Sequence, residues 1–452
     1  MFEHDGDIVM ANAAKRASAA SAIDAASVPV AVAQGDEVTA CIQNLGAQFE
    51  SEIIAWRRHF HQYPEVGACE DRTSATICAE LDKLGVEYRR IVGPRPAEFA
   101  GKDGRDDFIG TGIIATIRGC APGAYDEQGK PRKRVALRTD IDALPIAELS
   151  DVPFRSQNDG VMHACGHDCH MAMMLGAMRM LHELRECLCG EVRVLFQPAE
   201  EISIGARDMI AAGALDGVDA LYGAHIWSEV AAGTISCEPG PRMAFTDWFR
   251  IDIEGVSAHG SMPHKGVDAI VIAAEIIDAL QTIVSRRSSP FEPVVVTIGE
   301  IHGGTARNIM AGSAYLTGTV RTWHQGVRER IADRMERIAG KIAHAFGARI
   351  EFEFEAGNPS VINNAACAEV ARQAVVKVLG EQAVAKYEGT LAGEDFAEYL
   401  NHVPGVFVFV GTNNPAVGAE YPQHSCYYTV DESVLVKGSM VAAQWACDML
   451  AR

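Results

Sequence analysis

The densest group of side chains able to do chemistry lies at residues 163–170, where three histidines and two cysteines stand within eight positions. Imidazole and thiolate are the usual protein ligands of zinc and its neighbouring transition metals. Cys165 and His167 are two residues apart in a short turn, so an extended backbone would point both side chains the same way. Asp168 could orient a ligating imidazole. One alternative is a polar helix start beside buried cysteines, but the crowding favours a metal site. Another is a structural zinc, but the regular paired ligand spacing of zinc ribbons and fingers is missing.

Two adjacent carboxylates, Glu200 and Glu201, follow an expected strand at 191–197. Such a pair can divide the work of hydrolysis, because one carboxylate can bind a metal while the other takes a proton from the attacking water. By itself a pair of glutamates would more often be part of a solvated acidic loop. Its position directly after a strand makes catalysis the better interpretation.

Further potential ligands stand at the ends of two other expected strands. Asp140 and Asp142 come at the end of the run 134–140, and His225 ends the run 219–225. Open α/β sheets place their sites at the carboxyl ends of the strands. The repetition of this pattern therefore predicts one shared site at that edge of a sheet.

The elements that must position these residues alternate in the first half of the chain. Helices are expected at 171–184 and 206–215, between the strands at 134–140, 191–197 and 219–225. Strands alternating with helices predict a mostly parallel sheet covered by helices on both faces. A further buried strand is expected at 406–411.

The pattern changes after residue 240 to the order strand–helix–strand–strand–helix–strand, which is typical of a ferredoxin-like α+β unit. The six expected elements are 245–255, 266–284, 293–303, 314–322, 327–347 and 348–356. We therefore predict an α/β catalytic domain in two parts, interrupted by a ferredoxin-like domain. The predicted parts are a mobile tail at 1–35, the catalytic domain at 36–241 and 357–452, and the inserted domain at 242–356.

Composition limits the classes of function. A net charge of −20 argues against a nucleic-acid partner or an anionic membrane, which would repel such a surface. No run approaches the roughly 20 apolar residues that a membrane span requires. The acidic start lacks the features of a secretory signal, and the twelve scattered cysteines are expected to be reduced thiols of a cytoplasmic enzyme.

Several other candidates are weak when each is taken alone. His259 lies in the loop 257–264, where a lone histidine is more often a turn or core residue. The glycine-rich turn 303–308 lacks the spacing of a phosphate-binding loop, so no nucleotide is inferred. The acidic pair in 393–396 and the isolated His424 would be unremarkable polar groups.

Taken together and in order, these segments resemble the co-catalytic metallo-aminoacylase and carboxypeptidase family from about residue 46 to the end. The resemblance extends to its branch of hippurate hydrolases, N-acyl-amino-acid amidohydrolases and indole-acetyl-amino-acid hydrolases. It rests on 57–67, 137–146, 162–173, 195–201, 223–228, 255–264, 303–310, 318–322, 392–396 and His424. The resemblance implies a metal-binding domain whose ferredoxin-like insertion serves dimerisation and acts as a lid.

Carried over by position, the resemblance implies roles for individual residues. Two divalent transition-metal ions (zinc, manganese, cobalt or nickel) would be held by five ligands: Cys165, His167, Glu201, His225 and His424. Glu200 matches the general base, and Asp142 matches the acid that orients the site. Asp140 stands where more distant relatives have a ligating histidine, so its role is left open.

Three residues of the inserted domain match positions linked to the substrate. His259 matches a histidine offered across a dimer to the scissile carbonyl. Asn308 and Arg321 match positions associated with the polar or carboxylate end of the substrate. The partners implied are thus a small N-acylated amino acid and a second copy of the chain.

The expected reaction is hydrolysis of the amide bond of an N-acyl or N-aroyl amino acid, in which Glu200 takes a proton from a metal-activated water. Carboxylic acid and amino acid would be released. One alternative is a dipeptidase or an N-carbamoyl-amino-acid hydrolase, which needs a pocket for a free amine or a ureido group. A catalytically silent metal-binding homologue is disfavoured, because Glu200 and every candidate ligand are present.

Overall fold

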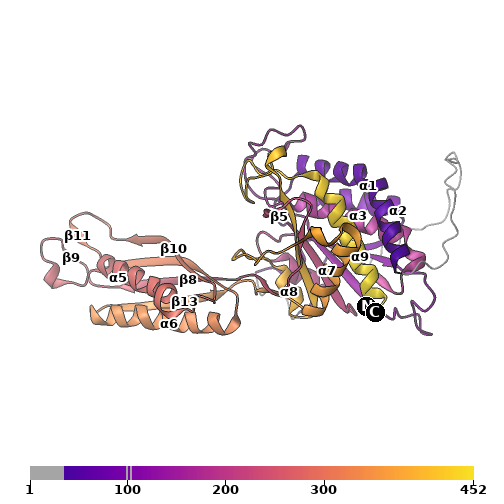
Figure 1. Ribbon diagram of the computed structural model, residues 1–452. Helices are drawn as coiled ribbons and strands as arrows, with labels where there is room; N and C mark the ends of the chain where they lie inside the picture. Colours follow the sequence, from indigo (N-terminus) through magenta and orange to yellow (C-terminus); the bar gives the residue numbers. More distant parts are fainter. Residues whose placement is uncertain (1–34, 98–99, 102–103) are drawn as a thin grey trace, which may run out of the picture.

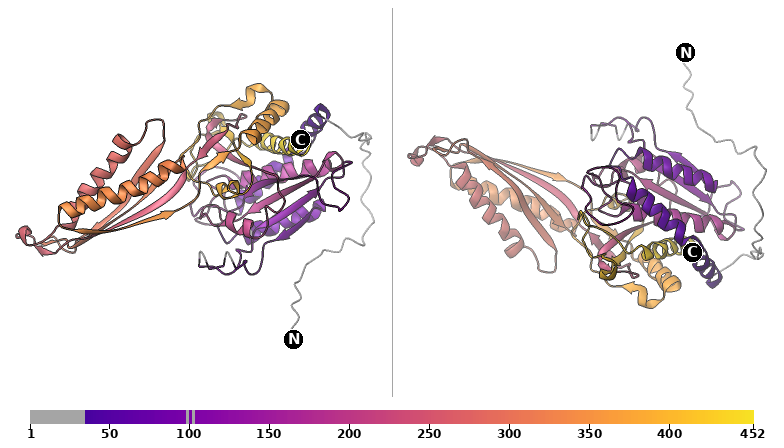
Figure 2. Two further views of the ribbon diagram at one scale, coloured as in Figure 1. Left: turned by 90° about the horizontal axis from the view of Figure 1, so that it is seen from below. Right: turned by 90° about the horizontal axis from the view of Figure 1, so that it is seen from above.

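The computed structural model describes residues 35–97, 100–101 and 104–452, so the expected tail at 1–35 lies outside the described residues except for its last one. The molecule is elongated, with a larger α/β part and a narrower arm that extends from one side of it (Figure 1). The two further views show the same arrangement from below and from above (Figure 2).

The larger part is built on one eight-stranded sheet in the order β1-β2-β4-β3-β5-β16-β6-β15. Its centre is parallel, because β4, β3, β5 and β16 pair in parallel, while β1, β2 and the β16–β6 pair add antiparallel neighbours. The mixed, mostly parallel sheet agrees with the fold class expected. The strands are β1 Glu87–Arg90, β2 Ile113–Arg118, β3 Arg134–Asp140, β4 Glu191–Gln197, β5 Ala220–Ala231, β6 Ile235–Ser236, β15 Val384–Ala385 and β16 Gly405–Asn413.

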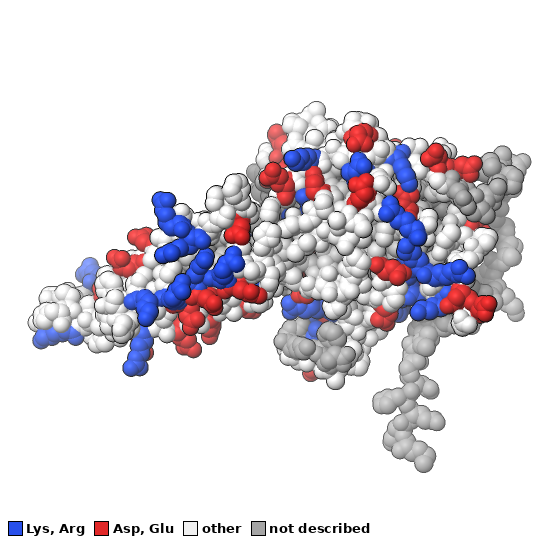
Figure 3. Space-filling view, turned by 60° about the horizontal axis from the view of Figure 1, so that its bottom comes forward, with Lys and Arg blue, Asp and Glu red and all other residues white. Residues whose placement is uncertain are grey.

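The arm holds a four-stranded antiparallel sheet in the order β10-β12-β8-β13. Its elements are β8 Phe245–Glu254, α5 Ala269–Thr282, β10 Val294–Gly303, β12 Ser313–Thr322, α6 Gln325–Ala345 and β13 Arg349–Ala356. This is the ferredoxin-like order of elements, and both helices pack on one face of the sheet. Charged side chains of both signs gather on the arm (Figure 3).

Two short ribbons mark the ends of the arm. Next to the larger part, β7 Gly240–Met243 pairs with β14 Val361–Asn363. At the far tip, β9 Ala258–His259 pairs with β11 Ile309–Met310 (Figure 1). The boundary expected between residues 241 and 242 falls inside β7. The division of the chain into domains at 241/242 and 356/357 stays a prediction.

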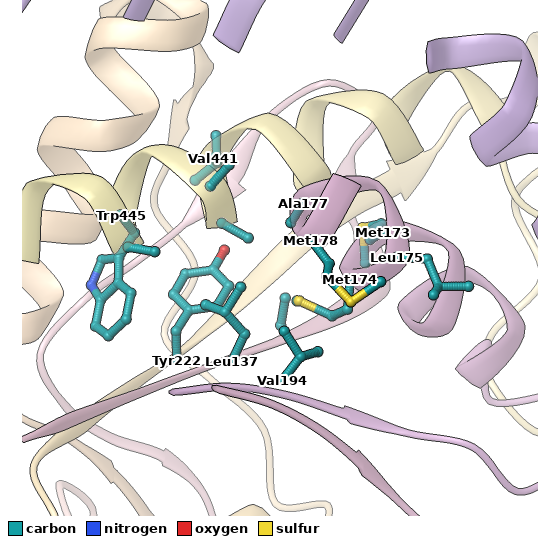
Figure 4. Close-up of a cluster of buried hydrophobic side chains, with 14 of the residues drawn as sticks. Leu137, Met173, Met174, Leu175, Ala177, Met178, Val194, Tyr222, Val441 and Trp445 are labelled. Carbon is teal, nitrogen blue, oxygen red and sulfur yellow. The ribbon is translucent and has the colours of Figure 1, made fainter. Parts of the chain in front are cut away.

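Helices cover both faces of the large sheet, as buried parallel strands require. One face carries α1 Asp36–Gln62, α2 Asp71–Leu84, α3 His167–Glu183, α7 Ala365–Leu379 and α9 Leu435–Leu450. The other carries the short helices α4 Gly205–Ala211 and α8 Phe396–Leu400. In Figure 4, side chains of α3 and α9 face Leu137, Val194 and Tyr222 of the sheet.

Helix α3 differs from the expectation in a way that matters for the site. It begins at His167 rather than at residue 171, so His167 and His170 belong to its first turn, whereas His163 precedes it. The helix is buried almost all round, which is why its sequence carries methionine and alanine on every side. None of the helices in the described part of the chain combines the length and the apolar character needed to cross a membrane.

Candidate metal centre

The structure brings the five ligand candidates together. The ligand atoms of Cys165, His167 and His225 lie within 4.8 Å of one another, and those of Cys165, Glu201 and His424 form a second such group. The first three side chains and most of Glu201 are buried, whereas the His424 side chain is 55% exposed. Side chains that could hold a metal ion therefore come together from segments that are far apart in the sequence.

Gly166 allows its two neighbours, Cys165 and His167, to reach the same site. Its φ of 100° is left-handed, and a Cβ there would lie 2.3 Å from Cδ1 of Ile226. Cys165 and His167 thus reach the same site through a left-handed glycine and a helix start, and the extended backbone expected from the sequence is wrong.

His225 lies inside β5 and not at its end, because β5 continues to Ala231. The pairing of β3 with β5 reaches Arg138 opposite Gly223, so His225 stands level with Asp140, where β3 stops. The ligands therefore still meet at the carboxyl edge of the neighbouring strands, and only the length of β5 was missed.

Hydrogen bonds fix which nitrogen each histidine offers. His225 Nδ1 donates to the Ile226 carbonyl at 2.6 Å, which leaves Nε2 facing Cys165 Sγ at 3.4 Å. His167 Nδ1 lies 3.3 Å from Asp142 Oδ1, while its Nε2 is buried without a hydrogen-bond partner. Such second contacts are how proteins orient ligating imidazoles. Asp142 Oδ2 also accepts the Glu201 backbone N–H at 3.0 Å, so this carboxylate braces two of the candidate ligands.

The pKa values of the clustered side chains show that acidic groups outnumber cationic ones at this site. Burial opposes a charge on His167, but Asp140, Asp142 and Glu201 outweigh it and raise its pKa to about 10. Burial raises the pKa of Glu201 to about 7, and it raises the pKa of the Cys165 thiol well above its ordinary value. Glu201 Oε1 is also buried without a partner. His167 Nε2 and Glu201 Oε1, both without a hydrogen-bond partner, thus lie together with the Cys165 thiol and the His225 imidazole. Ligand atoms of these types fit borderline-soft metal ions.

Glu200 stands beside this cluster. Its Oε1 accepts the Asp395 backbone N–H at 3.3 Å, and its Oε2 lies 4.0 Å from His167 Nε2. Burial, followed by the charges of Glu394 and Glu201, raises the pKa of Glu200 well above its ordinary value. The loop that holds it is strained, because neighbouring Ala199 has a φ of 53°.

Asp140 is engaged on both oxygens. Its Oδ1 accepts His170 Nδ1–H at 2.7 Å, and its Oδ2 accepts Arg138 Nη1–H at 2.7 Å. His170 Nε2 accepts the Ile226 backbone N–H at 2.9 Å, which fixes its tautomer. Arg138 is fully buried and also pairs with Asp395 at 2.8 Å. Sequence reasoning included His170 in the dense group at 163–170 without giving it a role of its own. It missed Arg138, although an arginine inside a strand expected to be buried on both faces was a usable signal.

A cavity of about 490 Å³ opens over the cluster and is lined from both the large sheet and the arm. Arg321 lines it, and no carboxylate of the described chain lies within 4 Å of this guanidinium. His259 and Asn308 are not there: they lie at the tip of the arm, where the Gly260 N–H donates to the Asn308 carbonyl at 2.9 Å (Figure 1). Two of the three candidates from the inserted domain are therefore absent from the site of their own chain.

A mixed α/β sheet with candidate metal ligands at one edge, joined to a ferredoxin-like arm, defines a hydrolase of the metal-binding peptidase type. The chain belongs to the family described as Peptidase family M20/M25/M40, whose model matches residues 136–448. It is accordingly a metal-dependent hydrolase that acts on amide bonds.

Individual relatives match 71% to 90% of the chain. An N-acetyl-L-cysteine deacetylase of Bacillus subtilis is 38% identical over 86% of this chain and 86% of its own. An N-acyl-L-amino acid amidohydrolase of Geobacillus stearothermophilus is 40% identical over 71% of this chain and 80% of its own. A crystal structure from Bacillus subtilis, described as a dinuclear metal binding peptidase from the M20 family, has a TM-score of 0.74 and 34% identity, covering 90% of this chain and 99% of its own.

Proposed function

We propose that the chain hydrolyses the amide bond of N-acyl or N-aroyl amino acids and releases a carboxylic acid and an amino acid. The observation that carries this proposal is the cluster of metal-ligating side chains beside Glu200 in the lining of a cavity, in which His167 Nε2 and Glu201 Oε1 are buried without a hydrogen-bond partner. Two relatives whose names describe N-acylated amino acid substrates support the substrate class.

Five residues would hold two divalent transition-metal ions: Cys165, His167, Glu201, His225 and His424. The dinuclear metal binding relative supports the number of ions, and the mixed sulfur, nitrogen and oxygen donors suit zinc, manganese, cobalt or nickel. When bound, such ions supply Lewis acidity, which activates water and polarises the scissile carbonyl.

Glu200 would act as the general base. Its Oε1 is tethered by the Asp395 N–H, so Oε2 remains free to take the proton of the attacking water and to deliver it to the departing amine. Asp142 positions His167 and Glu201 but, in this proposal, does not touch the substrate. Arg321 would bind the carboxylate of the amino acid, because it is the cavity's guanidinium without an acidic partner in the residues described.

His259 and Asn308 would be supplied by a second copy of the chain. The arm offers surfaces for a homodimer, since β10 is an unpaired edge of its sheet and α5 exposes Ile270 and Val271 beside it. Long unpaired edge strands readily pair with another chain. The enzyme would be cytoplasmic. Its twelve cysteines are all unpaired, and the cytoplasm keeps thiols reduced.

The test is a turnover panel of N-acetyl and N-benzoyl amino acids, dipeptides and N-carbamoyl amino acids, with wild-type protein and the Glu200→Gln variant. We expect acylated amino acids to be the best substrates, and the variant to lose on the order of 10³-fold in kcat while it retains its metal. Preferred turnover of dipeptides or carbamoyl compounds would select one of the alternative reactions. Full activity of Glu200→Gln would remove this residue from its role.

A further inference from the structure

Three side chains on β5 form a row into the cavity. His225, Trp227 and Glu229 of β5 all line the cavity. His225 and Trp227 are two residues apart in the regular part of the strand and therefore project on the same face of it, and Glu229 follows where the pairing with β16 becomes irregular. The rings of His225 and Trp227 are 5.3 Å apart between centroids. Glu229 lies two residues farther along the strand than Trp227, on the side away from His225.

Tyr387 holds the outer two members of this row in place. Trp227 Nε1–H donates to Tyr387 Oη at 2.8 Å, and because the phenol has a single proton, Tyr387 donates that proton to Glu229 Oε2 at 2.6 Å. Burial and the bond to Glu229 raise the pKa of Tyr387, so the phenol keeps this proton at neutral pH. Glu229 is thereby fixed at the wall of the cavity.

The carboxylate of Glu229 has no cationic partner among the residues that the structure describes, since no Lys, Arg or His nitrogen lies within 4 Å of it. Its position beyond an indole face is suited to a flexible alkyl chain that ends in a positive charge, because aromatic faces attract cations and the stems that carry them. The net charge of −20 would also draw cationic substrates toward the protein.

We propose that Glu229 determines specificity by binding the cationic end of the substrate. The preferred substrates would then be acylated amino acids that carry an ammonium or guanidinium group on a chain about as long as that of lysine or arginine. This inference rests on the proposed function, with the scissile carbonyl beside His225. Arg321, from the other sheet, would bind the carboxylate, so two opposite charges would orient the substrate.

The test compares substrates that differ only in the charge. Nα-acetyl-lysine is paired with Nα-acetyl-norleucine, and Nα-acetyl-arginine with Nα-acetyl-citrulline. We expect wild-type protein to prefer the cationic member of each pair by roughly tenfold in kcat/KM, as one charged hydrogen bond would give. Glu229→Gln keeps an acceptor for Tyr387, and it should raise KM for the cationic members until their kcat/KM equals that of the neutral members.

Two further variants sharpen the comparison. Glu388→Gln makes the same change of charge at an exposed position outside the cavity lining, and it should leave the preference intact. Tyr387→Phe releases Glu229, and it should weaken the preference without abolishing it.

Three outcomes would overturn the inference. The first is equal turnover of both members of each pair by wild-type protein, and the second is a preference that survives in Glu229→Gln. The third is an equal loss on cationic and neutral substrates together with a change of oligomeric state, which would mean that Glu229 contacts a second copy of the chain. Failure to hydrolyse any acylated amino acid would instead contradict the proposed function.

Discussion

At the scale of single residues, the site depends on one carboxylate that braces two ligand candidates. Asp142 holds the His167 ring through Oδ1 and the Glu201 backbone through Oδ2. We predict that Asp142→Asn weakens metal binding by 10-fold to 100-fold, the usual effect of losing such an outer contact. Competition with a chelator measures this, and Asp151→Asn, at an exposed position, is the control. Unchanged affinity would mean that Asp142 does not orient His167.

A second prediction concerns the contribution of Gly166 to the stability of the folded protein. In Gly166→Ala the new Cβ would meet Ile226, and the backbone would stay at a φ of 100°. We expect a loss of about 3 kcal/mol in the free energy of unfolding, from the clash and the left-handed strain together. Gly160→Ala, with a φ of +79° and open space around it, isolates the strain and should cost about 1 kcal/mol in urea unfolding. Equal losses in the two variants would exclude the clash.

Glu70 gives a pH-dependent prediction. Burial, and then the charge of Asp142, raises its pKa to about 7 from an ordinary value of 4.5. Between these values the unfolded chain releases the proton that the folded chain keeps, so the stability contributed by this group falls as the pH rises. The loss is at most about 3 kcal/mol.

In metal-free protein, Glu70→Gln should therefore match wild type near pH 4.5 in urea unfolding and exceed it by up to about 3 kcal/mol at pH 8. The glutamine can still accept the Ala199 N–H that Glu70 now accepts at 2.9 Å. A difference that is the same at both pH values would show that this carboxyl does not titrate in the range.

Residue types and spacing were enough to find the groups that meet at the site, because Cys165, His167 and the pair Glu200–Glu201 belong to dense, chemically unusual runs. Those that were missed act through burial, which a sequence does not display directly. Arg138 is recognisable as special only when its strand is known to be buried on both faces and to place it against Asp395.

At the scale of elements, α1 is tied to the first turn of α3 by a buried ion pair. Arg57 Nε donates to Asp168 Oδ2 at 2.9 Å, and His61 Nδ1 lies 2.8 Å from the same oxygen. Asp168 follows His167 directly, so this contact fixes the helix start that carries a ligand candidate. The sequence placed Asp168 near the site, but its partner on α1, more than 100 positions away, depends on tertiary packing.

We predict that Arg57→Leu costs about 3–5 kcal/mol in stability, because it strands a buried carboxylate. Arg58→Leu is a matched control: Arg58 pairs with Glu432 at 2.6 Å, but its side chain is 48% exposed. Its loss should cost less than about 1 kcal/mol. Urea unfolding of both variants, with metal content measured alongside, checks this. Similar losses in both would mean that the buried pair adds nothing beyond a surface contact.

At the scale of the whole molecule, the element order of the inserted segment was predictable because each strand and helix keeps a clear period over its length. The distance between the tip of the arm and the site was not predictable from the sequence. It depends on the direction in which the paired strands β7 and β14 lead the chain away from the large sheet. That separation leaves His259 at a tip far from the ligands of its own chain (Figure 1).

The proposed dimer therefore predicts complementation between two inactive variants. Glu200→Gln spoils the base of its own site, and His259→Ala spoils the group offered to the partner's site. In a mixed dimer, one of the two sites combines an intact Glu200 with an intact His259 from the other chain. Refolding equal amounts together makes half of the dimers mixed, so about a quarter of wild-type activity should return. Refolding each variant alone is the control. If the mixture stays inactive while light scattering shows a dimer, His259 does not complete the partner's site, and its placement at the tip needs another explanation.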